Sequence, residues 1–366
     1  MKILLQKEHL YNALVATERV TGKNLSLPVL RCVLLIAEKK ELVVRATNLD
    51  IGVEVRVPAD VSEEGTVAVP ADTLFTLLST LSYEGPLTLS LVDGSIVLST
   101  PKSTTRVATL SHEDFPRLPK ISDNHLFTIQ AKDFVTGLKS VWWSASVSSI
   151  KPELSSIYLY QNGEHLVCVA TDSFRLAEKK IKISKTEKLD SLLIPLKNVV
   201  EIIRHLENFS GDISVYGDVH QIGFTLGNTY ITSRVVDGVF PDYKQIIPKT
   251  FETEMTLLKQ DLADALKHVR IFSGQFNKLL VSINHTKKQC VVQTTNPESG
   301  ESSVSLDAAI TGPDITMSFN YAYILDALQT VATDSVTLQF AGVGKPTQIR
   351  SVGDQSFLYI VMPMNR

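Results

Sequence analysis

The chain has 366 residues, of which 44% are apolar and 20% charged, with 36 Lys and Arg against 39 Asp and Glu. This composition is typical of a folded protein of roughly two to four domains, and it excludes a disordered or strongly basic chain. Three cysteines without a nearby Cys or His partner argue against a disulfide framework and a structural zinc site, and no apolar run approaches the roughly 18 residues of a membrane span. We therefore expect a cytoplasmic protein.

The first third of the chain predicts a short strand that runs into a helix within residues 7–23, then several strands and a second helix. The second helix begins near Pro70, because apolar residues follow at the spacing i, i+3, i+4 and i+7 that forms one buried helical face. They are Leu74, Leu77, Leu78 and Leu81. Residues 87–100 alternate between apolar and polar around Asp93-Gly94, which predicts a hairpin.

The same pattern returns twice along the chain. A threonine after an alternating apolar run recurs at Thr47, Thr171 and Thr295, two steps of 124 residues, and a helix start recurs at Pro70, Pro195 and Asn320, two steps of 125. The strand and helix at the start are echoed near residues 127–146 and 253–274. Repeats of this length indicate duplicated domains, so we predict three similar α+β domains, each with two helices and antiparallel sheets, at residues 1–121, 125–248 and 250–366.

Six helices are predicted, at residues 7–23, 72–82, 132–144, 196–205, 259–270 and 320–332. Together they hold ten Lys and Arg against eight Asp and Glu, a net charge of +2, so the remainder of the chain carries −5. This sign suits helices that face phosphates inside an acidic exterior, but charges that merely solvate exposed helix faces explain the count equally well.

Catalytic and metal-binding patterns are absent from the sequence. The eight histidines lack metal-ligand spacing, no G-x-S-x-G sequence occurs, and Gly342-Val343-Gly344-Lys345-Pro346 lacks the first glycine and the final Ser or Thr of a phosphate-binding loop. Neighbouring carboxylates such as Glu63 and Glu64 are better explained as solvated residues than as acid/base pairs. We expect a protein that is not an enzyme and binds no cofactor.

Similar domains joined end to end can continue their sheets across domain boundaries through edge strands. Subunits that associate head to tail in this way can close into a ring.

Four segments resemble the β subunit of bacterial DNA polymerase III, the sliding clamp, in the family's order along the chain. Residues 170–177 (ATDSFRLA) are similar to its A-T-D-G-H-R-L-A segment, and residues 237–249 to its D-G-x-F-P-D-Y stretch. Residues 294–302 are similar to its N-N-P-E-x-E segment, and the ending 359–366 (YIVMPMNR) to its Y-V-V-M-P-M-R tail.

The resemblance implies a DNA clamp fold and a homodimeric ring of six domains around double-stranded DNA. Its function would be to tether the replicative DNA polymerase to its template and confer processivity by linkage, without reading base sequence. The clamp loader, other polymerases and repair factors would bind through short linear peptide motifs. No membrane partner is implied.

The resemblance also implies a cleft between the second and third domains that receives these apolar peptides. The matching positions are Leu154, Thr171, Ser173, Phe174, Arg175, Leu176, Pro241, Ile246, Asn320, Tyr323, Pro346, Val361, Met362, Pro363 and Met364. Methionines suit such a cleft because they repack around different partners, whereas for an arbitrary protein V-M-P-M would be a final core strand. Ser173-Phe174 replaces the usual Gly-His, and Gln245 replaces a basic residue, so we expect a different peptide preference.

The family's DNA contacts fall on Lys23, Lys197 and Lys151, while a basic position of the first domain is Asp72 here. For the dimer interface, similarity points to Val107 in the first domain and to Ile271-Phe272 in the third, although such residues could also belong to each domain's own core.

Two other classes of function stay open on the residues alone. One is a repeat-built scaffold that binds peptides without encircling DNA. The other is a hydrolase whose serine and histidine meet only in the folded chain.

Overall fold

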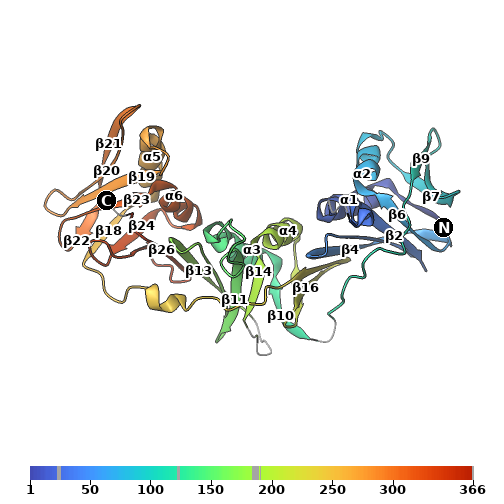
Figure 1. Ribbon diagram of the computed structural model, residues 1–366, viewed down its shortest axis with the longest axis horizontal. Helices are drawn as coiled ribbons and strands as arrows, with labels where there is room; N and C mark the ends of the chain where they lie inside the picture. Colours follow the sequence, from blue (N-terminus) through green and yellow to red (C-terminus); the bar gives the residue numbers. More distant parts are fainter. Residues whose placement is uncertain (23–25, 122–123, 184–188, 190, 365–366) are drawn as a thin grey trace. The chain divides into compact units, whose positions relative to one another are not determined.

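The computed structural model describes residues 1–22, 26–121, 124–183, 189 and 191–364 (Figure 1). Contacts divide the chain into two compact units: residues 1–132, 184–188 and 200–235 form the first, and residues 133–183, 189–199 and 236–366 form the second. The part of the chain described contains no helix that is long and apolar enough to cross a membrane. The unit boundary falls inside the predicted second domain because one half of its strands shares a sheet with the first domain and the other half with the third.

The first unit holds a five-stranded sheet, ordered β5-β1-β7-β8-β9, and an eight-stranded sheet, ordered β10-β15-β16-β17-β4-β3-β2-β6. Its elements are β1 (Lys2–Gln6), α1 (Lys7–Thr17), β2 (Cys32–Glu38), β3 (Glu41–Thr47), β4 (Ile51–Pro58), β5 (Asp60–Glu63), β6 (Gly65–Pro70), α2 (Ala71–Thr80), β7 (Pro86–Val92), β8 (Ser95–Ser99), β9 (Thr104–Ala108), β10 (His125–Gln130), β15 (Asp212–Gly217), β16 (Gln221–Leu226) and β17 (Thr229–Arg234).

The second unit holds a nine-stranded sheet, ordered β14-β11-β12-β13-β26-β25-β24-β18-β22, and a four-stranded sheet, ordered β21-β20-β19-β23. Its elements are β11 (Ser156–Asn162), β12 (His165–Thr171), β13 (Arg175–Lys182), β14 (Leu192–Pro195), β18 (Thr253–Leu258), α5 (Lys259–Val269), β19 (Lys278–Asn284), β20 (Gln289–Asn296), β21 (Gly300–Asp307), β22 (Ala309–Thr311), β23 (Ile315–Asn320), α6 (Tyr321–Thr330), β24 (Ser335–Phe340), β25 (Thr347–Ser351) and β26 (Phe357–Val361). Helix α3 (Ala131–Val141) lies almost wholly in it, and α4 (Leu196–Glu207) is divided between the units.

The six predicted helices are confirmed, although the first was predicted too long: α1 ends at Thr17 and only a 3-10 turn, Glu18–Val20, follows it. Each second helix buries part of the apolar face that its spacing indicated. Leu74 and Leu78 of α2 are buried, as are Ile324 and Leu328 of α6. Two of the lysines counted among the basic helix residues do not simply face solvent, because each binds the C-terminal end of the second helix of its domain. Lys7 Nζ donates to the Leu81 carbonyl after α2 at 2.7 Å, and Lys259 Nζ donates to the Val331 carbonyl after α6 at 2.9 Å. Cations at helix C-termini satisfy carbonyls that lack an intrahelical partner.

Two of the three repeated threonines, Thr47 and Thr171, close a turn between two strands with the same hydrogen bonds. Thr47 accepts a hydrogen bond from the Leu49 N–H and donates to the Ile51 carbonyl, and Thr171 makes the same two bonds with Ser173 and Arg175. Leu49 and Ser173 both have φ of +78°. The predicted hairpin is also confirmed, since Asp93 and Gly94 have the two positive φ angles of a type I′ turn.

Two joins continue the sheets from one domain to the next, as the sequence predicted. Strand β17 pairs antiparallel with β4, and β26 pairs antiparallel with β13. The register is also repeated: Thr229 lies opposite Val55 in the first join, and Phe357 lies opposite Lys179 in the second. Val55 and Lys179 are 124 residues apart, the period of the threonines. Each join therefore uses the same two strands of the repeated domain.

A buried carboxylate fixes the connector between the first two domains over the first join. Glu54 on β4 is 2% exposed and forms ion pairs with Arg45 at 2.7 Å, with Arg56 at 3.0 Å and with Lys120 of the connector at 3.3 Å. The Tyr230 hydroxyl of β17 donates to the Pro119 carbonyl of the same connector at 3.0 Å. Burial alone would raise the pKa of Glu54, but Arg45 and Lys120 outweigh it and hold the pKa below its usual value.

We predict that Glu54→Gln destabilises the protein by about 1–3 kcal/mol at neutral pH, because it removes charge-assisted hydrogen bonds from a buried site. A carboxyl whose pKa is lowered in the folded state adds stability above its unfolded pKa of about 4.3, and this contribution disappears as the pH falls through the folded value. Denaturant unfolding of both proteins at neutral and acidic pH measures this.

The loss of unfolding free energy caused by Glu54→Gln should be smaller at acidic pH than at neutral pH. Glu63→Gln is the control, since this carboxylate is 67% exposed and we expect its loss to change stability by less than about 0.5 kcal/mol. A Glu54→Gln deficit that is equal at both pH values would contradict the assignment.

Candidate functional site

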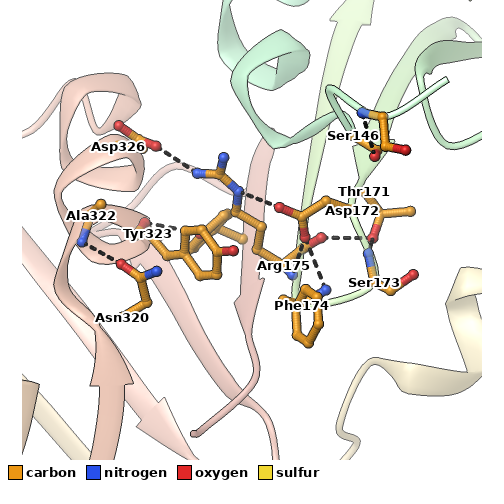
Figure 2. Close-up of polar contacts among 12 residues, drawn as sticks. Ser146, Thr171, Asp172, Ser173, Phe174, Arg175, Asn320, Ala322, Tyr323 and Asp326 are labelled. Atoms are coloured by element: carbon orange, nitrogen blue, oxygen red, sulfur yellow. Dashed lines mark hydrogen bonds and ion pairs between the residues drawn. The ribbon is translucent and has the colours of Figure 1, made fainter. Parts of the chain in front are cut away.

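The turn before β13 presents Phe174 to solvent. The Asp172 carboxylate accepts the backbone N–H groups of Phe174 at 2.9 Å and Arg175 at 3.0 Å, while Ser173 takes the left-handed conformation (Figure 2). Phe174 is 62% exposed as a result. The resemblance places glycine at position 173, and glycine adopts a positive φ without strain.

Arg175 links the turn before β13 to helix α6. Its Nε donates to Asp172 at 3.0 Å and its Nη1 to Asp326 at 2.5 Å, on opposite sides of the guanidinium (Figure 2). The same guanidinium lies over the Tyr323 ring, 4.3 Å from its centroid, and 5.4 Å from that of Trp143. Two carboxylates and two rings hold the planar cation in one orientation, so Arg175 fixes one wall of the site.

The C-terminal tail passes from core to surface within four residues. Val361 on β26 is 1% exposed, while Met362, Pro363 and Met364 are half-buried. The Met362 N–H donates to the Phe174 carbonyl at 2.9 Å, which sets the tail beside the exposed phenylalanine. Both sequence interpretations of V-M-P-M therefore describe part of it: the valine completes a core strand, and the next three residues form surface.

A pocket of about 390 Å³ lies against Met362. Ile246 and Pro346 also line it, so the fold brings together three of the predicted residues from segments far apart in sequence. Lys249 and Lys345 add positive charge to its wall. Gln245, where the resemblance expects a basic residue, lines the same pocket and bonds to Asp242 at 2.7 Å.

Four of the residues predicted to line the peptide cleft are buried in the core. Leu154, Thr171, Leu176 and Val361 are each less than 9% exposed, and Leu176 belongs to a core cluster with Phe240 and Tyr243. Asn320 accepts a hydrogen bond from the Ala322 N–H at 2.9 Å and begins α6, which carries Tyr323. Pro241 is exposed.

Sequence reasoning missed Asp326, Trp143 and the two pocket lysines. Asp326 could have been found, because it follows Tyr323 by three residues, which places both on one side of a helix. Trp143 gave no comparable signal, since its contact with Arg175 depends on how two distant segments pack.

The DNA candidates and the interface candidates lie elsewhere in the chain. Lys23 lies outside the described residues, Lys151 is exposed in the turns before β11, and Lys197 is exposed on α4. Val107 on β9 is 6% exposed and faces its own domain, whereas Ile271 is 68% exposed and Phe272 is half-buried in the 3-10 turn η5 (Arg270–Phe272).

Three domain families match the chain, all from DNA polymerase III beta subunit: the N-terminal domain at residues 1–119, the central domain at 128–242 and the C-terminal domain at 244–365. The beta sliding clamp of Escherichia coli K12 is 28% identical, with all of both chains covered. The crystal structure of the Pseudomonas aeruginosa subunit has a TM-score of 0.95 at 25% identity, and a Bartonella birtlesii clamp bound to griselimycin has 0.94 at 26%; both matches cover the whole of each chain.

Three repeated α+β domains with sheets joined end to end define a DNA clamp fold. The chain belongs to the DNA polymerase III β subunit family, the sliding clamps of bacteria. Its function is that of a sliding clamp, a non-catalytic processivity factor for a DNA polymerase. Three similar domains, the fold class and the non-enzymatic function are thereby confirmed, while the domain boundaries of the sequence analysis stay predictions.

Proposed function

We propose that two copies of this chain close head to tail around double-stranded DNA, through a third use of the join that already links the domains within one chain. The observation that supports this is the repeated register. Strand β4 corresponds to β13 and to β21, and β17 corresponds to β26 and to β9 by their order within each repeat. Because β4 pairs with β17 and β13 pairs with β26, the repeat assigns β21 of one copy to β9 of another.

Both strands are suited to this pairing. Strand β9 is an edge of the five-stranded sheet, and β21 is an edge of the four-stranded sheet. Ile271 and Phe276, 68% and 76% exposed, precede β19, and the Phe272 ring lies close to Gly300 at the start of β21. Open strand edges beside exposed apolar side chains favour association, and a head-to-tail interface closes into a ring when its rotation allows.

Partner proteins would bind in the pocket beside Met362. An apolar wall of Ile246, Pro346 and Met362, next to the exposed Phe174 ring, suits short peptides with aliphatic or aromatic side chains. Methionine adapts to different ligands, which suits a site that serves polymerases, the clamp loader and repair factors in turn. Lys249 and Lys345 favour peptides with acidic flanks.

We expect few contacts between the protein and DNA, and none that depends on the base sequence. Lys151 and Lys197 are exposed, and Lys23 is a third candidate outside the described residues. Lysines that meet phosphates without base contacts allow sliding, and closure around the duplex makes strong binding unnecessary. We place this action in the cytoplasm.

The register predicts which residues meet at the dimer interface. Glu54 lies two residues after Gly52, the partner of Thr47, and Ser303 lies two residues after Glu301, the partner of Thr295, since the third turn is one residue longer. We therefore expect Thr105 of β9 to lie opposite Ser303 of β21, as Tyr230 lies opposite Glu54 in the first join. We expect Thr105→Cys with Ser303→Cys in one chain to form intermolecular disulfides on oxidation, because directly opposed residues place their Cα atoms within about 4.4–6.8 Å. A non-reducing gel and light scattering should give a covalent dimer of about twice 40.4 kDa.

Thr105→Cys with Ser305→Cys is the matched control. It moves one cysteine two residues out of register, to about 7–8 Å, so we expect much slower cross-linking. Equal cross-linking of both pairs, or none of either, would refute the proposed interface.

For the cleft, we predict that Ile246→Glu weakens binding of fluorescently labelled griselimycin at least about tenfold, because the variant puts a charge into an apolar wall. Fluorescence anisotropy measures the affinity. Val239→Glu is the control, since Val239 is 89% exposed and does not line the pocket. Unchanged affinity of the Ile246 variant would show that the ligand binds elsewhere.

A further inference from the structure

Two pockets occupy equivalent positions in the first and third domains. The first, of about 630 Å³, lies between β1, the β2–β3 turn and the start of β5, and the second, of about 680 Å³, lies between β18, the β19–β20 turn and the start of β22. The Ala59 N–H donates to the Lys40 carbonyl at 3.1 Å in the first, and the Ala308 N–H donates to the Lys288 carbonyl at 3.0 Å in the second. These four residues line the pockets, so both pockets come from the repeat.

The first pocket lies beside an open strand edge. Strand β7 pairs with all five residues of β1, whereas β5 on the other side reaches only as far as Leu4. The Lys7 N–H donates to the Gly85 carbonyl on the β7 side. Because successive residues of an antiparallel ladder turn their N–H groups to opposite sides, the Gln6 N–H points past the end of β5, and Gln6 lines the pocket.

The third domain repeats this open edge. Strand β24 pairs with β18 as far as Leu258, whereas β22 reaches only Thr256. The Lys259 N–H donates to the Asp334 carbonyl on the β24 side, so the Leu258 N–H points to the side that β22 leaves open. Leu258 lines the second pocket as Gln6 lines the first. Each pocket therefore offers one strand N–H to an added segment.

Both pockets have apolar walls beside this edge. Leu4 is 43% exposed in the first pocket, and Leu258 is 53% exposed in the second. Leu5 and Leu257, at equivalent places in their strands, line the pockets as well. Exposed aliphatic side chains next to an unpaired edge form a surface that one more strand would cover.

A pair of neighbouring lysines gives each pocket its charge. All four lysines are exposed, and none of them forms an ion pair within the part of the chain that the structure describes. Each pocket also has one aspartate, Asp60 or Asp307, so its net charge is positive and suits an acidic ligand. The lysines are Lys39 and Lys40 in the first pocket and Lys287 and Lys288 in the second.

The second domain carries the opposite charge at this turn. The Ile183 N–H donates to the Glu164 carbonyl at 2.9 Å, as the two alanines donate to Lys40 and Lys288 in the other copies. Glu164 is exposed like the lysines that it replaces. The fold of the repeat thus accepts either charge here, and folding alone does not require the lysines.

We propose that each of the two pockets docks an extended acidic segment of a partner protein. A carbonyl of this segment accepts the N–H of Gln6 or Leu258, and its carboxylates lie against the lysine pair. In this strand addition, backbone hydrogen bonds provide affinity and the side-chain pocket provides specificity. The proposal goes beyond the peptide cleft, because neither pocket shares a residue with the pocket beside Met362. The join of β17 with β4 leaves the first pocket open, since no residue of β17 lines it.

The probe is a fluorescently labelled hexapeptide, Glu-Val-Glu-Leu-Glu-Val, titrated into the full chain at low ionic strength, where the lysines are least screened. Anisotropy should show saturable binding. The combined Lys40→Glu, Lys288→Glu variant should weaken it at least about tenfold, because like charges then face each other. The variant should fold, since glutamate occupies this turn in the second domain.

Hydrogen exchange followed by mass spectrometry locates the peptide. Binding should slow amide exchange in the segments that contain Gln6 and Leu258. Lys40→Glu alone should abolish the effect only at Gln6, and Lys288→Glu alone only at Leu258. Binding without slower exchange in either segment would contradict strand addition.

A matched control separates the lysine pairs from net charge. The combined Arg117→Glu, Lys182→Glu variant makes the same change of charge at two exposed residues outside both pockets and should keep the affinity. Equal weakening in this control, equal binding of Lys-Val-Lys-Leu-Lys-Val, or no saturable binding up to about 1 mM peptide would overturn the proposal. Displacement by griselimycin would assign the peptide to the cleft, and equally tight binding of a DNA hexanucleotide would assign the lysines to phosphates; either result would also refute it.

Discussion

The whole structure depends on one backbone interaction: the antiparallel pairing of a domain's last strand with the strand that follows the threonine turn in the preceding domain. Edge strands carry unpaired N–H and C=O groups that must find partners or be protected. Here β17 on β4 and β26 on β13 satisfy those groups in the same register. When three domains are joined in this way, the first domain keeps a last strand with one free edge, β9, and the third keeps a strand with one free edge after its turn, β21. These two edge strands correspond to the two partners of each join.

The two joins differ in the polar chemistry that holds the connectors over them. Glu54 and Glu178 occupy the same position of the repeat, 124 residues apart, and both are nearly buried. Glu54 holds its connector through Lys120, whereas Glu178 accepts a hydrogen bond from the Tyr243 hydroxyl, which also bonds to Tyr160. A buried carboxylate needs partners in either case, and duplication has kept the carboxylate while exchanging a cation for a phenol.

The sequence was sufficient to predict what depends on neighbouring residues or on the period. The apolar spacing after Pro70, the Asp93-Gly94 hairpin and the 124-residue step gave the helices, the turn and the three domains. It was not sufficient for features that depend on how distant segments pack. Nothing local to Leu176 indicates that it faces a core while Phe174, two residues before, faces solvent, and the ion pair of Arg175 with Asp326 joins positions 151 residues apart.

The central claim is that function follows from closure and not from tight binding to DNA. The most direct measurement loads the Thr105→Cys, Ser303→Cys protein onto nicked circular plasmid, oxidises it to seal the interface, and follows retention by gel filtration in high salt before and after the plasmid is cut once. The account predicts that the sealed protein stays on the circle, where salt weakens only the phosphate contacts, and is lost once the DNA has ends. Equal retention on circular and linear DNA, or equal loss from both, would contradict it.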